Sequence, residues 1–319
     1  PIRLRNIYGF SWKGKTGLKE CSMAEDRIRI LLAVDGSDQA FEAARYVSQL
    51  FAPNRIDVVL FHVTPKIPES FWDIDEDPEL MLKDAALGVS EHPQEKEIQQ
   101  LMERARQLFL DRGVPEDLVK AKIQERQVGI ARDIIYESER DYQAVVLGRW
   151  GMSLLKDFLW GSIADKLLGR LTHVPLCVVG GTPHVGKILV GLDASEGAMR
   201  AVDYVGTMVS AYLQVTLYHA VRALDEEISH KAEESMKSVF EKATGRLENA
   251  GFRRNQITAR TATGVLSRAG AIIQYALKGE YGTIVVGRRG LSEVEEFPMG
   301  RVSNKVIHMA KELAVWVVS

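Results

Sequence analysis

The sequence predicts an α/β protein of two tandem, doubly wound domains, and three observations lead to this prediction. The chain has 319 residues, which is enough for two domains of ordinary size. One series of segments occurs twice along the chain. Within each copy, short apolar runs alternate with longer segments of helical period. This alternation is typical of right-handed βαβ units, which build a parallel sheet with helices on both faces.

The internal repeat is visible segment by segment. The matching segments are 28–50 and 187–209, 58–63 and 215–220, 144–151 and 283–290, and 175–180 and 314–319. The spacings agree as well, because Asp35 precedes His62 by almost the same number of residues as Asp193 precedes His219. A duplication explains both the likeness of the segments and their common spacing.

The repeat also predicts the domain boundaries. We expect an N-terminal extension at 1–26, a first domain at 27–180 and a second domain at 187–319, joined by the Gly- and Pro-containing linker 180–186. The main difference in length is an insertion at 64–93 in the first domain, rich in proline and acidic residues. A surface excursion and a lid over a site are the two alternatives for this insertion.

The strands of the first copy are predicted from its apolar runs. Continuous apolar runs, typical of strands buried on both faces of a parallel sheet, lie at 30–34, 58–63, 144–148 and 176–179. Residues 118–125 and 256–262 alternate between polar and apolar side chains, which favours less buried edge strands.

The helices are predicted from helical periodicity and from their start signals. Ser37 and Asp38 favour a helix start directly after the first strand. Further helices are expected at 129–139, 162–171 and 266–277.

Charge and composition exclude several classes of protein. Lys plus Arg number 41 and Asp plus Glu 43, so the net charge of -2 argues against a nucleic-acid partner. The sequence contains no apolar stretch of about 18 residues, so we expect no membrane span. Cys21 and Cys177 are too few for a disulfide framework, and the 7 histidines are scattered. These features favour a reduced, cytoplasmic protein.

Each copy carries three glycines at one fixed spacing after its fourth strand, with two residues between the first pair and nine between the second. These glycines, with the residue that follows them, are Gly148, Gly151, Gly161 and Ser162 in the first copy and Gly287, Gly290, Gly300 and Arg301 in the second. Glycine allows positive φ and lets main-chain N–H groups approach an anion, and a helix start adds further N–H groups. The pattern predicts a phosphate site. The alternative is that the glycines only make tight turns and that Asp35 only caps a helix.

The segments AVDGS (33–37), LFHV (60–63) and PLCVVG (175–180), together with the glycine spacing, resemble the universal stress protein family. The resemblance covers nearly all of 27–319 and is to a tandem member. It implies a five-stranded parallel sheet of order 3-2-1-4-5 in each domain. It also implies bound ATP, with Mg²⁺ on the phosphates.

The resemblance implies binding positions in both domains. In the first domain they are Val34, Asp35, Val63, Leu147, Gly148, Gly151, Gly161, Ser162 and Ile163. In the second they are Asp193, Ala220, Val286, Gly287, Gly290, Gly300 and Val302. Arg301 stands where the family has Ser or Thr, and it could pair with phosphate or fill the pocket. We therefore expect ATP in the first domain and weak or no binding in the second.

The function expected from these features is that of an ATP-binding stress-response or signalling protein without catalytic residues. A slow ATPase or phosphotransferase and a nucleotide-free adaptor remain alternatives. Arg149, Arg288 and Arg289, beside the glycines, are either solvated loop charges or phosphate partners. His62 and His219 lie inside strands and are expected to be buried with their hydrogen bonds satisfied. A P-loop pattern at 9–16 lacks a preceding buried strand, so we expect no function from it.

The fifth strands predict how the two domains assemble. Both 176–179 and 315–318 are apolar throughout, and an uncovered edge strand of this kind promotes association. The short linker gives the two strands a high effective concentration. We therefore expect them to pair within one chain as a pseudo-dimer, and a further homodimer of whole chains stays open.

Overall fold

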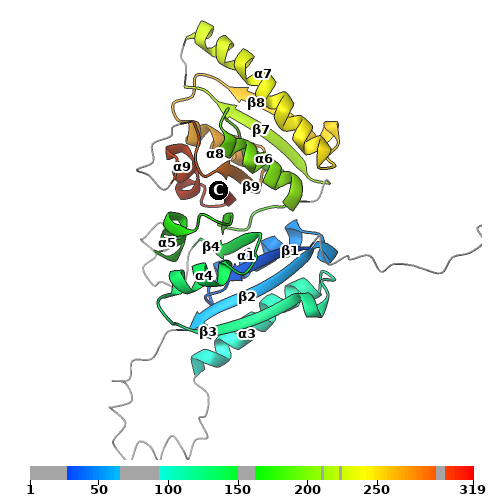
Figure 1. The fold of residues 1–319 in the computed structure, drawn as a ribbon, viewed down its shortest axis with the longest axis vertical. Helices are drawn as coiled ribbons and strands as arrows, with labels where there is room; N and C mark the ends of the chain where they lie inside the picture. The colour runs from blue at the N-terminus through cyan, green and yellow to red at the C-terminus, as the bar shows by residue number, and fades with distance from the viewer. Residues whose placement is uncertain (1–26, 65–92, 150–161, 210–211, 223–224, 292–298) are drawn as a thin grey trace, which may run out of the picture.

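The computed structural model describes residues 27–64, 93–149, 162–209, 212–222, 225–291 and 299–319. The predicted extension, its P-loop pattern and almost all of the insertion lie outside the described residues. Figure 1 shows two α/β domains stacked along the long axis, with the C-terminal strand near their boundary.

The first domain contains five strands and four described α-helices. In chain order they are β1 (Ile28–Ala33), α1 (Asp38–Leu50), β2 (Ile56–Thr64), α3 (Pro93–Leu110), β3 (Val119–Glu125), α4 (Ile130–Ser138), β4 (Ala144–Gly148), α5 (Ser162–Arg170) and β5 (Leu176–Val179). The second domain repeats this order with β6 (Lys187–Gly191), α6 (Glu196–Met208), β7 (Gln214–Ala220), α7 (Glu226–Asn249), β8 (Ile257–Ala262), α8 (Arg268–Lys278), β9 (Thr283–Gly287), α9 (Arg301–Met309) and β10 (Ala314–Val318). Short 3₁₀ helices lie at Pro53–Arg55, Glu116–Leu118 and Arg254–Gln256.

The described strands form one ten-stranded sheet, in the order β3-β2-β1-β4-β5-β10-β9-β6-β7-β8. Each domain has the predicted order 3-2-1-4-5, so the predicted fold class is confirmed. All pairs are parallel except β5 with β10, which run antiparallel with Cys177 opposite Trp316. The predicted pairing of the two fifth strands is therefore confirmed, and it joins two sheets into one. The alternating strands β3 and β8 lie at the two outer edges, as predicted.

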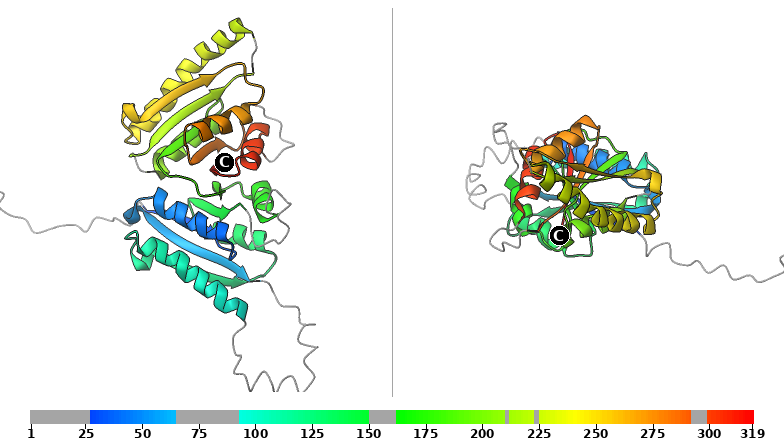
Figure 2. Two further views of the ribbon diagram at one scale, coloured as in Figure 1. Left: turned by 180° about the vertical axis from the view of Figure 1, so that it is seen from behind. Right: turned by 90° about the horizontal axis from the view of Figure 1, so that it is seen from above.

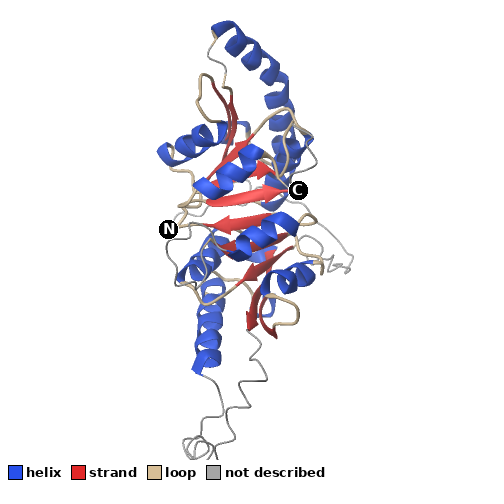
Figure 3. Ribbon diagram, turned by 90° about the vertical axis from the view of Figure 1, so that its left-hand side faces the viewer, coloured by secondary structure: helices blue, strands red, loops and turns tan. Residues whose placement is uncertain are grey.

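Helices cover both faces of the sheet (Figures 2 and 3). Side chains of α1, α3, α6 and α7 pack on one face, and those of α4, α5, α8 and α9 pack on the other. Each of the two apolar clusters contains residues of both domains: Ile30 and Trp316 share one, and Leu31 and Val315 share the other. The hydrophobic core is thus continuous across the domain boundary.

The predicted helix start at Ser37 is confirmed and recurs in the second domain. The side chain of Ser37 accepts a hydrogen bond from the Ala40 amide, and Ser195 accepts one from the Ala198 amide. Each serine satisfies an amide that has no partner within its helix, which stabilises the helix start by about 1 kcal/mol.

Two tyrosines, the buried Tyr46 and the partly buried Tyr204, hold the two domains together beside the paired strands. The hydroxyl of Tyr46 lies 2.8 Å from Oγ1 of Thr283 and accepts a hydrogen bond from Nε1 of Trp316 at 2.9 Å. At the equivalent place, the Tyr204 hydroxyl donates to the carbonyl of Gln143 at 3.0 Å. Burial raises the pKa of both tyrosines, so their hydroxyls stay protonated and able to donate.

Val317→Asp tests the importance of the β5–β10 pair. Val317 is fully buried opposite Leu176, so the new carboxylate would lose its hydration without gaining a partner. We expect the free energy of unfolding, measured by denaturant titration, to fall by about 3 kcal/mol or more. Thr258→Asp introduces the same charge on the exposed edge strand β8 and should change stability little. Equal stabilities for the two variants would contradict the prediction.

Candidate functional site

The candidate site lies at the carboxyl ends of the central strands, where the strand order reverses between β1 and β4. The amide of Val34 donates to the Phe61 carbonyl at 2.8 Å, and Ala33 lies opposite Leu147. Asp35 therefore follows a strand that is flanked by the ends of β2 and β4. In an open parallel sheet, this reversal point is the usual place for a ligand.

The structure brings most of the predicted site residues to this edge in each domain. Val34, Val63, Leu147, Ala220, Val286 and Gly287 are buried, and Asp35, Gly148, Ile163, Asp193, Gly290, Gly300 and Val302 are partly exposed. Gly151 and Gly161 lie outside the described residues. Ser162 is the first residue of α5, but its side chain is also outside the description.

The aspartates hold the serines that cap the following helices. Oδ1 of Asp35 accepts hydrogen bonds from the amide of Ser37 at 3.1 Å and from its hydroxyl at 2.6 Å. Asp193 makes the same two bonds to Ser195. The sequence analysis did not include these serines among the site residues. Their signal was present, because a serine follows the aspartate at the same spacing in both repeats. These bonds fix the orientation of the carboxylates.

The second oxygen of Asp193 faces the glycine segment. A Cβ atom placed on Gly290 would lie 2.6 Å from Oδ2 of Asp193, and one on Gly300 would lie 3.5 Å from the amide nitrogen of Gly290. The carboxylate, the second glycine and the start of α9 are therefore near neighbours.

His62 and His219 support the same strand ends. Nδ1 of His62 lies 2.6 Å from the carbonyl oxygen of Val34, and Nδ1 of His219 lies 2.7 Å from that of Leu192. Since a carbonyl only accepts, each Nδ1 carries the proton. The predicted satisfied imidazoles are confirmed, although His219 is only partly buried. Each ring holds the peptide unit directly before an aspartate.

The glycines serve close packing rather than positive φ. None of the described signature glycines has a positive φ, and Gly300 has φ -65°, so the expectation of positive φ is wrong for these four positions. A Cβ on Gly148 would lie 2.7 Å from the main-chain carbon of Gln39, and one on Gly287 would lie 2.5 Å from that of Gly197. These glycines let β4 and β9 touch the first turns of α1 and α6. At Gly300, in contrast, an added Cβ would come no closer than 3.4 Å to the described atoms, which is an ordinary van der Waals distance.

Arg149 and Arg288 are neither solvated nor placed as phosphate partners, so both interpretations are wrong for them. Arg149 donates from Nη1 to the Ile307 carbonyl at 2.6 Å and from Nη2 to the Ala310 carbonyl at 2.7 Å. Both carbonyls belong to the C-terminal end of α9, in the other domain. Burial lowers the pKa of Arg149 to about 10, so the guanidinium remains charged at neutral pH.

Arg288 makes the reciprocal contact with the first domain. Its Nη1 donates to the Leu168 carbonyl at 2.7 Å and its Nη2 donates to the Leu171 carbonyl, at the C-terminal end of α5. The last carbonyls of a helix lack intrahelical partners and carry the negative end of its dipole, so a buried guanidinium satisfies them well. Figures 1 and 2 show α5 and α9 next to each other at the domain boundary.

Arg289 and Arg301 are exposed on the second domain. Arg289 is thus a solvated loop charge. Arg301 is the first residue of α9, and because its side chain is exposed, the expectation that its bulk fills a pocket is wrong. The alternative that Arg301 pairs with phosphate stays a prediction.

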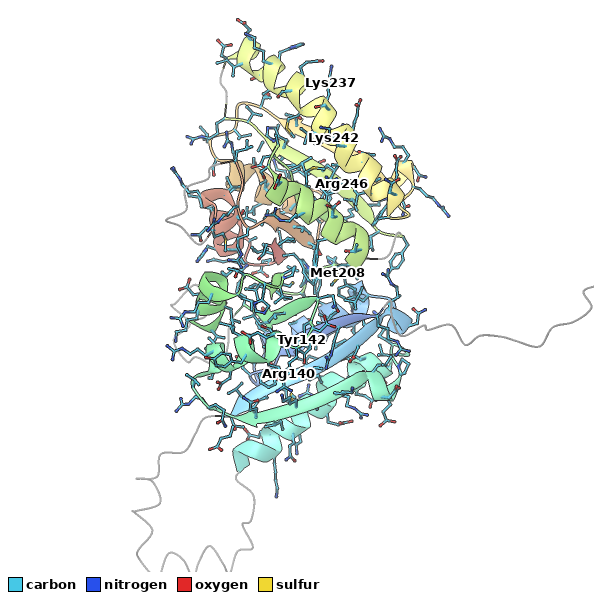
Figure 4. The ribbon with its side chains drawn as sticks, viewed as in Figure 1. Arg140, Tyr142, Met208, Lys237, Lys242 and Arg246 are labelled. Atoms are coloured by element: carbon cyan, nitrogen blue, oxygen red, sulfur yellow. The ribbon has the colours of Figure 1, made fainter. Side chains whose placement is uncertain are left out.

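A buried carboxylate away from this edge has only structural partners. Glu137 of α4 accepts hydrogen bonds from the Tyr142 hydroxyl at 3.0 Å and from Nζ of Lys122 at 2.6 Å, and Arg140 forms an ion pair with it at 3.4 Å. Figure 4 labels Arg140 and Tyr142 at this cluster. Both oxygens of Glu137 are satisfied, so the cluster stabilises the fold.

The described part of the chain contains no group of three or more His, Cys, Asp or Glu side chains that could hold a metal ion. It also contains no helix long and apolar enough to cross a membrane.

A model of the universal stress protein family matches the chain twice, over residues 27–180 and 184–319. The chain therefore belongs to the universal stress protein family, as a tandem, two-domain member. A search of curated proteins found no match.

Solved structures of the same fold extend over nearly the whole chain. A universal stress protein from Archaeoglobus fulgidus DSM 4304 is similar over 91% of this chain and 98% of its own, with a TM-score of 0.60 and 19% identity. A protein of unknown function from Pseudomonas aeruginosa PAO1 is similar over 93% of this chain and 94% of its own, with a TM-score of 0.51 and 17% identity. A universal stress protein solved in complex with cAMP is similar over 42% of this chain and 96% of its own, with a TM-score of 0.32 and 24% identity.

Gly148→Ala tests why the first signature glycine is needed. The new methyl group would collide with the main chain of Gln39, which cannot move without shifting α1. We expect the free energy of unfolding to fall by about 1–3 kcal/mol, as in other overpacked cores. Gly169→Ala is the matched control, because a Cβ there meets nothing within 4 Å and alanine favours the helix. That variant should gain about 0.5–1 kcal/mol, and similar losses in both would contradict the packing argument.

Proposed function

We propose that this universal stress protein binds ATP at the carboxyl edge of its first domain, and binds it weakly or not at all in the second. The observation that carries the proposal is the grouping of a fixed carboxylate, a glycine segment and a helix start at the strand-order reversal. In the second domain, Asp193, Gly290 and Gly300 are near neighbours. From the repeat, we infer the same relation between Asp35 and the start of α5 in the first domain.

The chemistry of these groups suits a nucleotide. In the proposal, Asp35 and the main chain near Val63 hold the adenosine end, as the family resemblance implies. The free amides and positive dipole end of α5 hold the phosphates, and the Ser162 hydroxyl adds a donor. The described residues include no metal-binding cluster, so Mg²⁺ would be held chiefly by the phosphates and would neutralise part of their charge.

The two domains differ at the position where the phosphates would approach. Ser162 is a small hydrogen-bond donor, whereas Arg301 at the same place in α9 is a long, exposed cation. Because Arg301 is longer than serine and replaces its hydroxyl group, we expect the phosphates to fit the start of α9 less well than the start of α5. A cytoplasmic stress-response or signalling role, with ATP as a structural ligand or switch, completes the proposal.

The position of Arg149 favours binding over fast turnover. A phosphotransferase or ATPase needs a base or an arginine aimed at the γ-phosphate. Arg149, the arginine nearest the first-domain glycines, is buried and donates to two carbonyls of α9. The proposed activity is therefore ATP binding with at most slow hydrolysis.

Titration calorimetry of the full chain with Mg²⁺–ATP tests the proposal. The wild-type chain should bind one ATP, and Gly161→Val should weaken binding by at least about tenfold, or 1.4 kcal/mol, because we expect a bulky residue directly before α5 to hinder phosphate binding by the α5 amides. Gly300→Val, at the matching position, should leave the affinity unchanged. Circular dichroism of both variants verifies folding, and mass spectrometry of the purified wild-type chain identifies any nucleotide it retains.

Two results would count against the proposal. Unchanged affinity in Gly161→Val would mean that the phosphates bind elsewhere. Loss of binding in Gly300→Val, with Gly161→Val unaffected, would assign the nucleotide to the second domain.

A further inference from the structure

The helix that begins at the proposed phosphate site of the first domain ends on a residue of the second domain. Helix α5 has 9 residues, from Ser162 to Arg170. The carbonyls of Leu168 and Leu171, at its C-terminal end, both accept hydrogen bonds from the guanidinium of Arg288. Isolated helices shorter than about 12–15 residues are marginal in water, so α5 depends on such contacts for its order.

Arg288 is itself held firmly by the second domain. Its amide donates to the carbonyl of Val318, and its Nε donates to Oγ of Ser319 at 3.0 Å. Its carbonyl accepts a hydrogen bond from the amide of Gly300, the residue that caps α9, at 2.8 Å. One residue therefore connects the glycine edge of the second domain with the far end of the phosphate helix of the first.

We propose that Arg288 is a positioning residue for the nucleotide site of the first domain, supplied by the second domain. This inference rests on the proposed function, because it concerns the affinity of that same ATP site. Arg288 satisfies two buried carbonyls and places a positive charge at the negative end of the α5 dipole. Both effects hold the last turn of α5 in its helical form and so hold the first-turn amides in register for the phosphates.

The consequence is that neither half of the chain forms a complete site alone. Without Arg288, the carbonyls of Leu168 and Leu171 would be left unpaired in an apolar interface, and the last turn of α5 would open to find other partners. A ligand held by the first turn would then bind with lower affinity, because part of its binding free energy would be used to re-form the helix. A ligand whose contacts lie only at the strand ends would keep its affinity.

The experiment compares ATP with adenosine on full-length variants by titration calorimetry. In Arg288→Met, which keeps much of the side-chain volume, the affinity for ATP should fall about fivefold and that for adenosine by less than about twofold. Tyr204→Phe is the control, because it removes another interdomain hydrogen bond, partly buried and made to the Gln143 carbonyl, without touching α5. It should change neither affinity.

Hydrogen exchange of the same variants provides a readout that needs no ligand. The amide of Leu171, bonded to the Leu167 carbonyl at 2.7 Å, should exchange faster in Arg288→Met and at the wild-type rate in Tyr204→Phe. If Arg288→Met fails to fold, Arg288→Lys replaces it. Lysine keeps the charge but lacks the fork that reaches two carbonyls, so the same changes should appear at smaller size.

The outcomes separate this inference from the proposed function. A wild-type chain that binds no ATP overturns both. A wild-type chain that binds ATP, with Arg288→Met binding it equally well or losing ATP and adenosine in equal proportion, overturns only the role of Arg288. If Tyr204→Phe weakens ATP binding to the same degree, the effect of Arg288→Met comes from general loosening of the interface. That result would also overturn the role of Arg288.

Discussion

The antiparallel contact between β5 and β10 determines how the rest of the molecule is arranged. Each strand is the last of its own sheet and is buried on both faces, so neither domain could expose it to water without a large apolar edge. Pairing the two strands covers both edges and relates the domains by an approximate two-fold axis. Contacts at the boundary therefore occur in equivalent pairs. Arg149 and Arg288 each reach the end of the other domain's helix, and Tyr46 and Tyr204 each reach the strand region opposite.

The two halves are equivalent in outline but not in chemistry, and duplication within one chain makes this possible. Cys177 lies opposite Trp316, where a symmetric homodimer would have two identical residues. The indole of Trp316 packs against the rings of Phe51 and Tyr204, and its N–H reaches the Tyr46 hydroxyl. The small Cys177 leaves space for such a ring, and burial raises the pKa of its thiol, which therefore stays protonated. The same freedom allows Ser162 at the start of α5 and Arg301 at the start of α9.

Local patterns in the sequence predicted the features that depend on local physics. Buried strands, edge strands and the Ser37 cap can each be predicted from a few neighbouring residues. The strand order was implied by the family resemblance. The roles of Arg149 and Arg288 could not be predicted in this way, because their partners lie in the other domain. These partners are main-chain carbonyls, which every residue has, so the sequence does not mark them. The packing role of Gly148 could not be predicted either, because it also depends on a contact that the sequence does not show. Its lack of a side chain matters because α1 crosses close to the strand end, and only the packed structure shows that approach.

The continuity of the molecule limits how a ligand could change it. One sheet and two apolar clusters cross the domain boundary, so the described part of the chain offers no hinge between domains. A response to a ligand must therefore pass through smaller elements, and α5 and α9 are among those that touch both a candidate site and the opposite domain. At about 1.5 Å per residue, the 9 residues of α5 span about 14 Å between the strand-end edge and Arg288. In the proposed function, ligand binding at one end and domain contact at the other act on one short helix, and linkage requires that any effect of one on the other is reciprocal.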